Sequence, residues 1–289
     1  MIQKKDFNYF KKSAVLVLLL FFQQFDGFAQ NQKVADSLVK IYKKNTLNNS
    51  EKMELLRNLS FNESNNLQLA LKYARELIAL AKSENNYLYL YRGYNQSGNK
   101  FILTGDYNKA LDSYFKSAQA AVKAQYVPGE GMSYTCIANV YSTMGNAKNA
   151  EVYYDKAIQI LRKATNQIAL ATALLNAGDE YSKNLKLNLA LNYFNEAGTI
   201  FKSEDYQIGV AYTLGNTGMV YAKQGKDELA IKYINAAISI LEKQEDYYGV
   251  SDYLFYMSDI YFKQKDWKSA LYYAKRSLKL AQKQGLKEQ

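Results

Sequence analysis

The chain has no histidine among its 289 residues and only one cysteine, Cys136. Histidine is the commonest general base and a frequent metal ligand, so its absence removes the usual centre of many hydrolases and metalloenzymes. A single cysteine excludes a disulfide within the chain and every paired-cysteine motif. The sequence also lacks a phosphate-binding P-loop and a serine nucleophile elbow. We therefore expect a protein that is not an enzyme and uses neither a cofactor nor a metal.

Proline is almost as scarce, with one residue at position 128. Because proline cannot continue a helix that precedes it, a helix must end just before Pro128. Gly129 and Gly131 follow it, but the third glycine and the preceding strand of a dinucleotide-binding loop are missing. We interpret these glycines as a close contact between neighbouring helices.

The chain is basic, with 37 Lys+Arg against 27 Asp+Glu. The lysines are scattered rather than gathered into a stripe, so we interpret them as a solvated surface and expect no nucleic acid partner.

Residues 1–29 have the pattern of a signal peptide. Four lysines at positions 4, 5, 11 and 12 come first, an apolar run over residues 14–22 follows, and Gly27-Phe28-Ala29 resembles a cleavage site. Nine apolar residues span about 14 Å as a helix, whereas a bilayer core is about 30 Å thick. The sequence therefore predicts an exported protein, periplasmic or secreted, with no stable membrane span after cleavage. An uncleaved anchor is the alternative.

An alanine recurs every forty residues along the remainder of the chain. The alanines are Ala70, Ala110, Ala150, Ala190, Ala230 and Ala270. Nine residues before each of them stands an aromatic ring, and twelve residues before it stands a small or short side chain. Such a fixed period is the sequence signature of a repeat protein.

Each repeat contains two helical stretches separated by a short breaker. Spacings of three, four and seven residues around the alanines put the apolar groups on one helical face. Between the two stretches lie Gly105, Gly145, Gly225 and Lys265, each next to a polar residue that favours a turn. A repeat is therefore predicted to be a helix, a tight turn and a second helix.

This pattern resembles the tetratricopeptide repeat family over residues 50–285, although the family's usual period is about 34 residues. The resemblance implies an all-α fold, a right-handed α-solenoid of about six helix-turn-helix repeats. We predict a capping helix over residues 30–49, which covers the edge of the first repeat, and the solenoid over residues 50–289. Ser50 is the expected N-cap of its first helix.

By the same resemblance, the first helix of each repeat lines a concave wall that holds a peptide or a protein segment. The residues predicted to contact it are Arg92, Asn95, Asn99, Asn139, Asn176, Asp179, Lys183, Tyr212, Asn216, Tyr256 and Asp259. Asparagine amides both donate and accept hydrogen bonds, so a column of them suits the main chain of an extended peptide. Tyrosines add apolar area with a polar tip.

The last helical stretch carries Leu271, Leu278 and Ala281 at positions that face the following repeat in earlier units. An apolar edge of this kind predicts an interface, either with a second copy of the chain or with a separate partner. A polar tail folded over the edge is the alternative.

Two functions are compatible with these features. The first is an exported scaffold that binds a protein or peptide ligand in its concave groove. The second is the sensor part of a two-component or transcriptional signalling system whose output domain lies on another chain or has been lost.

Overall fold

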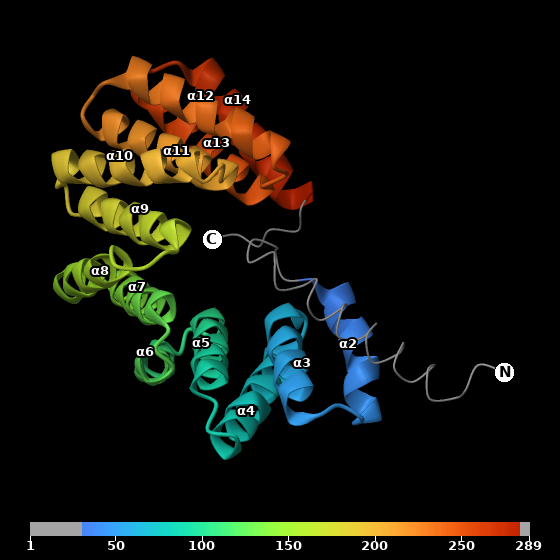
Figure 1. The fold of residues 1–289 in the computed structure, drawn as a ribbon. Coiled ribbons are helices and arrows are strands. Elements are labelled where there is room, and N and C mark those ends of the chain that lie inside the picture. Colours follow the sequence, from blue (N-terminus) through green and yellow to red (C-terminus); the bar gives the residue numbers. More distant parts are fainter. Residues whose placement is uncertain (1–30, 284–289) are drawn as a thin grey trace. The chain divides into compact units, whose positions relative to one another are not determined.

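The computed structural model describes residues 31–283 and contains thirteen α-helices and no strand in that range (Figure 1). The predicted signal peptide lies outside the described residues. The helices are α2 Gln32–Lys44, α3 Asn49–Asn62, α4 Leu67–Ser83, α5 Tyr87–Leu103, α6 Tyr107–Lys123, α7 Val127–Thr143, α8 Ala147–Leu161, α9 Gln167–Lys183, α10 Leu187–Ser203, α11 Gln207–Lys223, α12 Asp227–Lys243, α13 Tyr247–Lys263 and α14 Trp267–Lys283. The all-α expectation is confirmed. None of these helices is both long enough and apolar enough to cross a membrane.

The helices from α3 onward form consecutive antiparallel pairs. Within pairs, α3 packs on α4, α5 on α6, α9 on α10, α11 on α12 and α13 on α14. Between pairs, α4 packs on α5, α8 on α9, α10 on α11 and α12 on α13. First helices of successive pairs also touch, since α3 contacts α5 and α11 contacts both α9 and α13. The first helices of neighbouring repeats therefore lie side by side, as the helix-turn-helix prediction requires.

The chain divides into two compact units, and the division falls between Ser133 and Tyr134, within α7. The first unit has a core of buried leucines and tyrosines from α2 to α6, with Leu59 and Leu77 fully buried. The second unit has two core clusters, one around Phe194 and one around Ile234. Each unit thus buries its own apolar surface.

The alanines of the forty-residue ladder are buried, as the repeat pattern predicts. Ala70, Ala110, Ala150, Ala190 and Ala230 have 0% exposure and Ala270 has 6%. A small side chain at this position lets the two helices of a pair approach closely, because a methyl group fills the contact. The ladder therefore marks a buried position that recurs in every repeat.

The turns between helices share one backbone geometry. Gly105, Gly145 and Gly225 each have φ +72°, and Lys265 has φ +62°. The residue after each turn donates its N–H to the carbonyl five residues earlier, as Asn146 does to Tyr141 at 2.8 Å. These are Schellman motifs, which need one residue in the left-handed region.

The same geometry also ends the first helix α9 and the second helices α4, α6, α10 and α12. The non-glycine residues with positive φ at such turns include Asn85, Gln125, Leu185, Asp205 and Glu245. Together with the glycines they recur every twenty residues from 85 to 265, except at 165. The backbone period is thus half of the sequence period, which the sequence pattern did not reveal because only some of these positions are glycine.

The N-cap of α3 is Asn48, so the prediction of Ser50 was wrong. The Asn48 side chain accepts the N–H of Glu51 at 3.0 Å, and the Glu51 carboxylate accepts the Asn48 N–H at 3.1 Å. This reciprocal pair is a capping box, and it satisfies two backbone donors at once. If Ser50 were the N-cap, the residue three positions later would have no carboxylate to complete such a reciprocal pair.

Helix α2 packs on α3 through one apolar side. Ala35 has 0% exposure and Leu38 has 6%, while Lys33, Asp36 and Lys40 point to solvent. Such a helix, apolar inside and polar outside, leaves no apolar surface on its outer side.

Candidate functional site

Eight of the predicted ligand residues lie on the first helices of the second unit. They are Asn139 on α7, Asn176, Asp179 and Lys183 on α9, Tyr212 and Asn216 on α11, and Tyr256 and Asp259 on α13. We call this set the first-helix face. The other three, Arg92, Asn95 and Asn99, lie on α5 in the first unit.

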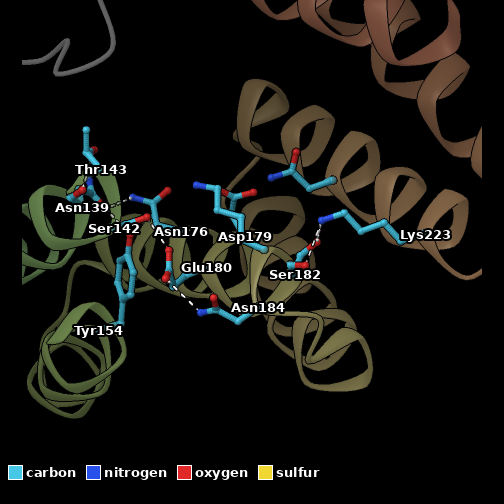
Figure 2. A network of polar contacts seen from close by, with 12 residues as sticks. Asn139, Ser142, Thr143, Tyr154, Asn176, Asp179, Glu180, Ser182, Asn184 and Lys223 are labelled. Carbon is cyan, nitrogen blue, oxygen red and sulfur yellow. Dashed lines mark hydrogen bonds and ion pairs between the residues drawn. The ribbon is translucent and has the colours of Figure 1, made fainter. Parts of the chain in front are cut away.

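The side chain of Asn139 is held by two neighbours (Figure 2). The hydroxyl of Tyr154, a residue of α8 with 3% exposure, donates to Asn139 Oδ1 at 2.6 Å. Asn176 donates its Nδ2 to the same oxygen at 3.3 Å, which links α7 to α9. Because the oxygen is occupied, the NH₂ group of Asn139 is the part of the amide left for another acceptor.

A second asparagine, Asn216, is held in the same way. The hydroxyl of Tyr253, which has 1% exposure, donates to Asn216 Oδ1 at 2.8 Å and to the Tyr212 carbonyl at 3.1 Å. The ring reaches this position only because residue 215 is glycine. A Cβ there would lie 2.0 Å from the Tyr253 ring.

In the first unit, Asn99 repeats the arrangement of Asn139. Tyr114 on α6 donates its hydroxyl to Asn99 Oδ1 at 2.7 Å, and Asn99 donates Nδ2 to Asn95 Oδ1 at 3.4 Å. In both repeats the tyrosine follows its asparagine by fifteen residues. A buried hydroxyl from the second helix therefore fixes the amide on the first helix.

Most charged side chains of the first-helix face are paired within their own helix. Lys183 contacts Asp179 at 2.6 Å, and Lys263 contacts Asp259 at 2.6 Å. Both pairs have the i,i+4 spacing that brings side chains together on a helix. A ligand that binds to either charge must compete with an existing ion pair.

Lys223 on α11 has a different environment. Its Nζ donates to the carbonyl and the hydroxyl of Ser182 at 3.0 and 2.9 Å, near the end of α9 (Figure 2). Burial lowers the pKa of this amine, and the negative charge of Asp179 opposes that shift. Lys223 therefore ties α11 to the C-terminal end of α9, where a positive charge is favourable.

Asp252 on α13 lies in the same unit as Asp179. Its side chain is exposed, but partial desolvation by the surrounding chain raises the pKa of its carboxyl, and Asp179 raises it further. The pKa of Tyr256 is also raised, first by burial and then by Asp252. No cluster of three possible metal ligands occurs in the described part of the chain.

Arg92 in the first unit is fixed by a buried carboxylate. Its Nη1 lies 3.2 Å from Glu54 Oε2, and its guanidinium lies 4.9 Å from the centre of the Tyr89 ring. Glu54 also binds Arg57 at 2.7 Å and accepts the Tyr89 hydroxyl at 2.9 Å. The guanidinium of Arg92 is thereby held close to an aromatic ring.

Sequence reasoning missed the partners that orient these residues, above all Tyr154, Tyr253 and Glu54. One signal was available. Tyr114 and Tyr154 are forty residues apart, and each follows an asparagine by fifteen residues. For Tyr253 and Asn216 the contact crosses between repeats, so no spacing within one repeat could reveal it.

The predicted edge residues lie on α14. Leu271 and Leu278 are 55% and 53% exposed, and Ala281 is half-buried.

The fold resembles several solved structures of low sequence identity. Apo RapI is 18% identical over 94% of this chain and 98% of its own, with a TM-score of 0.72. A Rap protein complexed with competence and sporulation factor is 13% identical over 98% and 88% of the two chains, with a TM-score of 0.64. A signal transduction ATPase with a tetratricopeptide repeat sensor, from Pyrococcus horikoshii, is 17% identical over 91% of this chain but only 41% of its own, with a TM-score of 0.67.

Comparison with curated protein sequences gave no match. A family model described as tetratricopeptide repeat matches residues 130–203 and 209–283, which together make up more than half of the sequence. The first matched segment runs from within α7 to the end of α10, and the second from within α11 to the end of α14. The chain therefore belongs to the tetratricopeptide repeat family.

Proposed function

We propose that this protein is an exported, non-catalytic scaffold that binds a peptide or protein segment along its first-helix face. One observation carries the proposal. The amide oxygens of Asn139 and Asn216 are occupied by the hydroxyls of buried tyrosines, at 2.6 and 2.8 Å. Their NH₂ groups are therefore oriented before a ligand arrives, which lowers the entropy that binding must overcome.

Fixed amide donors suit the carbonyl groups of a peptide main chain. A main chain offers one carbonyl per residue whatever its side chains, so such donors bind without regard to sequence. Tyr212 and Tyr256, on α11 and α13 of the same face, add aromatic surface. The Rap protein solved with competence and sporulation factor shares the fold, which supports a ligand-binding role for an array of this kind.

The experiment combines cross-linking with a matched pair of variants. The mature protein is cross-linked in its own cell envelope, and the captured partner is identified by mass spectrometry. Asn139, Asn176 and Asn216 are then replaced together by alanine. Each lost hydrogen bond is worth about 0.5–1.5 kcal/mol, so the affinity for the captured partner should fall at least about tenfold.

The control variant replaces Asn188, Asn192 and Asn235 by alanine. These asparagines are exposed on second helices α10 and α12, away from the first-helix face. The control should bind the partner as the parent does, and both variants should keep the parent's helical circular dichroism. Equal affinity of the parent and the first-helix variant would show that the ligand binds elsewhere.

Export has its own test, which is independent of binding. The predicted signal peptide ends at Ala29, so N-terminal sequencing of protein from the periplasm or the medium should begin at Gln30. Protein that begins at Met1 and sediments with the membrane fraction would instead support an uncleaved anchor.

The sensor function is the second candidate, and one observation favours it. A signal transduction ATPase with a tetratricopeptide repeat sensor shares the fold over 91% of this chain. If this chain senses a ligand for another protein, the captured partner should be a membrane-spanning kinase or a transcriptional regulator. Capture of other envelope proteins alone would support the scaffold.

A further inference from the structure

We propose that the outer side of the α13–α14 pair is a docking site for an amphipathic helix of another protein, with acidic residues along the sides of that helix. The surface consists of Phe255 and Phe262 on α13 and of Trp267, Leu271 and Leu278 on α14. Their exposures are 61%, 58%, 58%, 55% and 53%. We call it the terminal edge. It is separate from the asparagines of the proposed ligand-binding face.

In the preceding repeat, the equivalent surface is covered by a helix. Ile238 and Leu241 on α12 have exposures of 4% and 0%, and α13 packs on that helix. Forty residues later, α14 has Leu278 and Ala281 at the same positions. Leu278 is 53% exposed where Ile238 is covered. The outer side of α14 therefore corresponds to a surface that another helix covers in the preceding repeat.

The apolar residues of α14 form a continuous seam. Trp267, Leu271, Ala274, Leu278 and Ala281 follow one another at intervals of four and three residues. This is the spacing by which two helices pack along each other. Phe262 extends the seam to α13, because its ring meets the Trp267 ring edge to face at 5.1 Å. Two helices thus present one apolar strip.

The charges beside the seam decide between partners. Helix α14 contains four lysines and one arginine and no acidic residue. Arg276 is engaged by Glu242, whereas Lys268, Lys275 and Lys279 have exposed side chains. Lys268 and Lys275 directly follow seam residues, a position where coiled coils place charges that select a partner. A helix with glutamate or aspartate beside its apolar residues complements them.

A second copy of the chain is a poorer occupant for the same reason. Two α14 helices packed along their seams would bring Lys268 and Lys275 of one copy near the same lysines of the other. Like charges so close together oppose association. The terminal edge therefore favours a partner of opposite charge.

The only tryptophan of the chain, Trp267, lies in the terminal edge and reports on its occupation. The full mature chain is titrated with two synthetic amphipathic helices that share the apolar residues of α13. One carries glutamate at every exposed position and the other carries lysine. The glutamate helix should shift Trp267 emission to shorter wavelength and saturate. The lysine helix should bind at least about tenfold more weakly, since three rim charges change from attraction to repulsion.

A double variant, Leu271→Lys with Leu278→Lys, should abolish the emission shift. Both positions are exposed, so the helical circular dichroism should stay unchanged. The matched control is Leu189→Lys with Leu229→Lys, two leucines of α10 and α12 that are 38% and 40% exposed. It should respond like the parent. Capture of the ligand at the first-helix face should be unaffected by either variant.

Four results would overturn the proposal. The first is an emission spectrum of a buried indole before any helix is added. The second is equal binding of the glutamate and lysine helices, or of neither. The third is a shift that follows protein concentration together with a dimer in sedimentation, which would identify a second copy as the occupant. The fourth is a shift with phosphatidylglycerol vesicles but not with the glutamate helix, which would identify a membrane surface.

Discussion

Replacement of Tyr154 by phenylalanine isolates the hydrogen bond that orients Asn139. The ring has 3% exposure, and its hydroxyl donates to Asn139 Oδ1 at 2.6 Å. The next repeat already has phenylalanine at the equivalent position, Phe194, with 1% exposure. The fold therefore accommodates a ring without the hydroxyl, and the substitution should remove one hydrogen bond without opening a cavity.

The expected loss of stability follows from that bond alone. A hydrogen bond between neutral side chains contributes about 0.5–1.5 kcal/mol. For a unit of this size, about 1 kcal/mol corresponds to a fall in Tm of roughly 2–4 °C. The amide of Asn139 should also become mobile, because the weak contact from Asn176 at 3.3 Å is then its remaining restraint.

Two measurements check this prediction. Thermal unfolding gives the stability, and the order parameter of the Asn139 side-chain NH₂ group by NMR gives the mobility. Tyr134→Phe is the control, because Tyr134 is half-buried in the same unit and should change neither quantity. A loss above about 3 kcal/mol would mean that the ring itself had moved. An unchanged order parameter would refute the claim that Tyr154 orients Asn139.

Three further predictions concern the fold. Leu185→Gly should stabilise the second unit by about 1 kcal/mol in urea unfolding, because Leu185 is 73% exposed and has φ +58°. Gly145→Ala should destabilise the unit by a similar amount, since φ at this residue is +72° and nothing lies near the added methyl group. Equal stabilities of the two variants and the parent would contradict the strain argument. Gly215→Ala should cost more, about 1–3 kcal/mol, and should weaken ligand capture because the added Cβ would displace Tyr253; a variant as stable as the parent would show that the ring has room. Lys100 is fully buried, and burial lowers the pKa of its amine below the unfolded value of about 10.4. Between these two pKa values the unfolded chain binds more protons than the folded chain. The parent should therefore gain stability over Lys100→Met as the pH rises through that window. A difference between the two proteins that stays constant from pH 7 to 10.5 would contradict this.

The sequence alone determined the class and the period of the fold. The ladder of alanines from Ala70 to Ala270 predicted a packing contact in each repeat, and all six alanines are buried. This succeeded because a helix repeats its face every few residues, so contacts made by neighbouring repeats leave a regular mark on the sequence. The turn residues Gly105, Gly145 and Gly225 were predictable for a similar reason, since glycine adopts positive φ without strain.

Only the tertiary structure shows which contacts orient the side chains of the site and which of its charges are paired. The bond from Tyr253 to Asn216 crosses between repeats, and the pairing of Arg92 with Glu54 joins residues 38 positions apart. Neither contact follows from helical periodicity, because side chains from different helices meet according to how the helices pack. The same holds for Leu278, which has the repeat position of the buried Ile238 but is 53% exposed among residues 31–283.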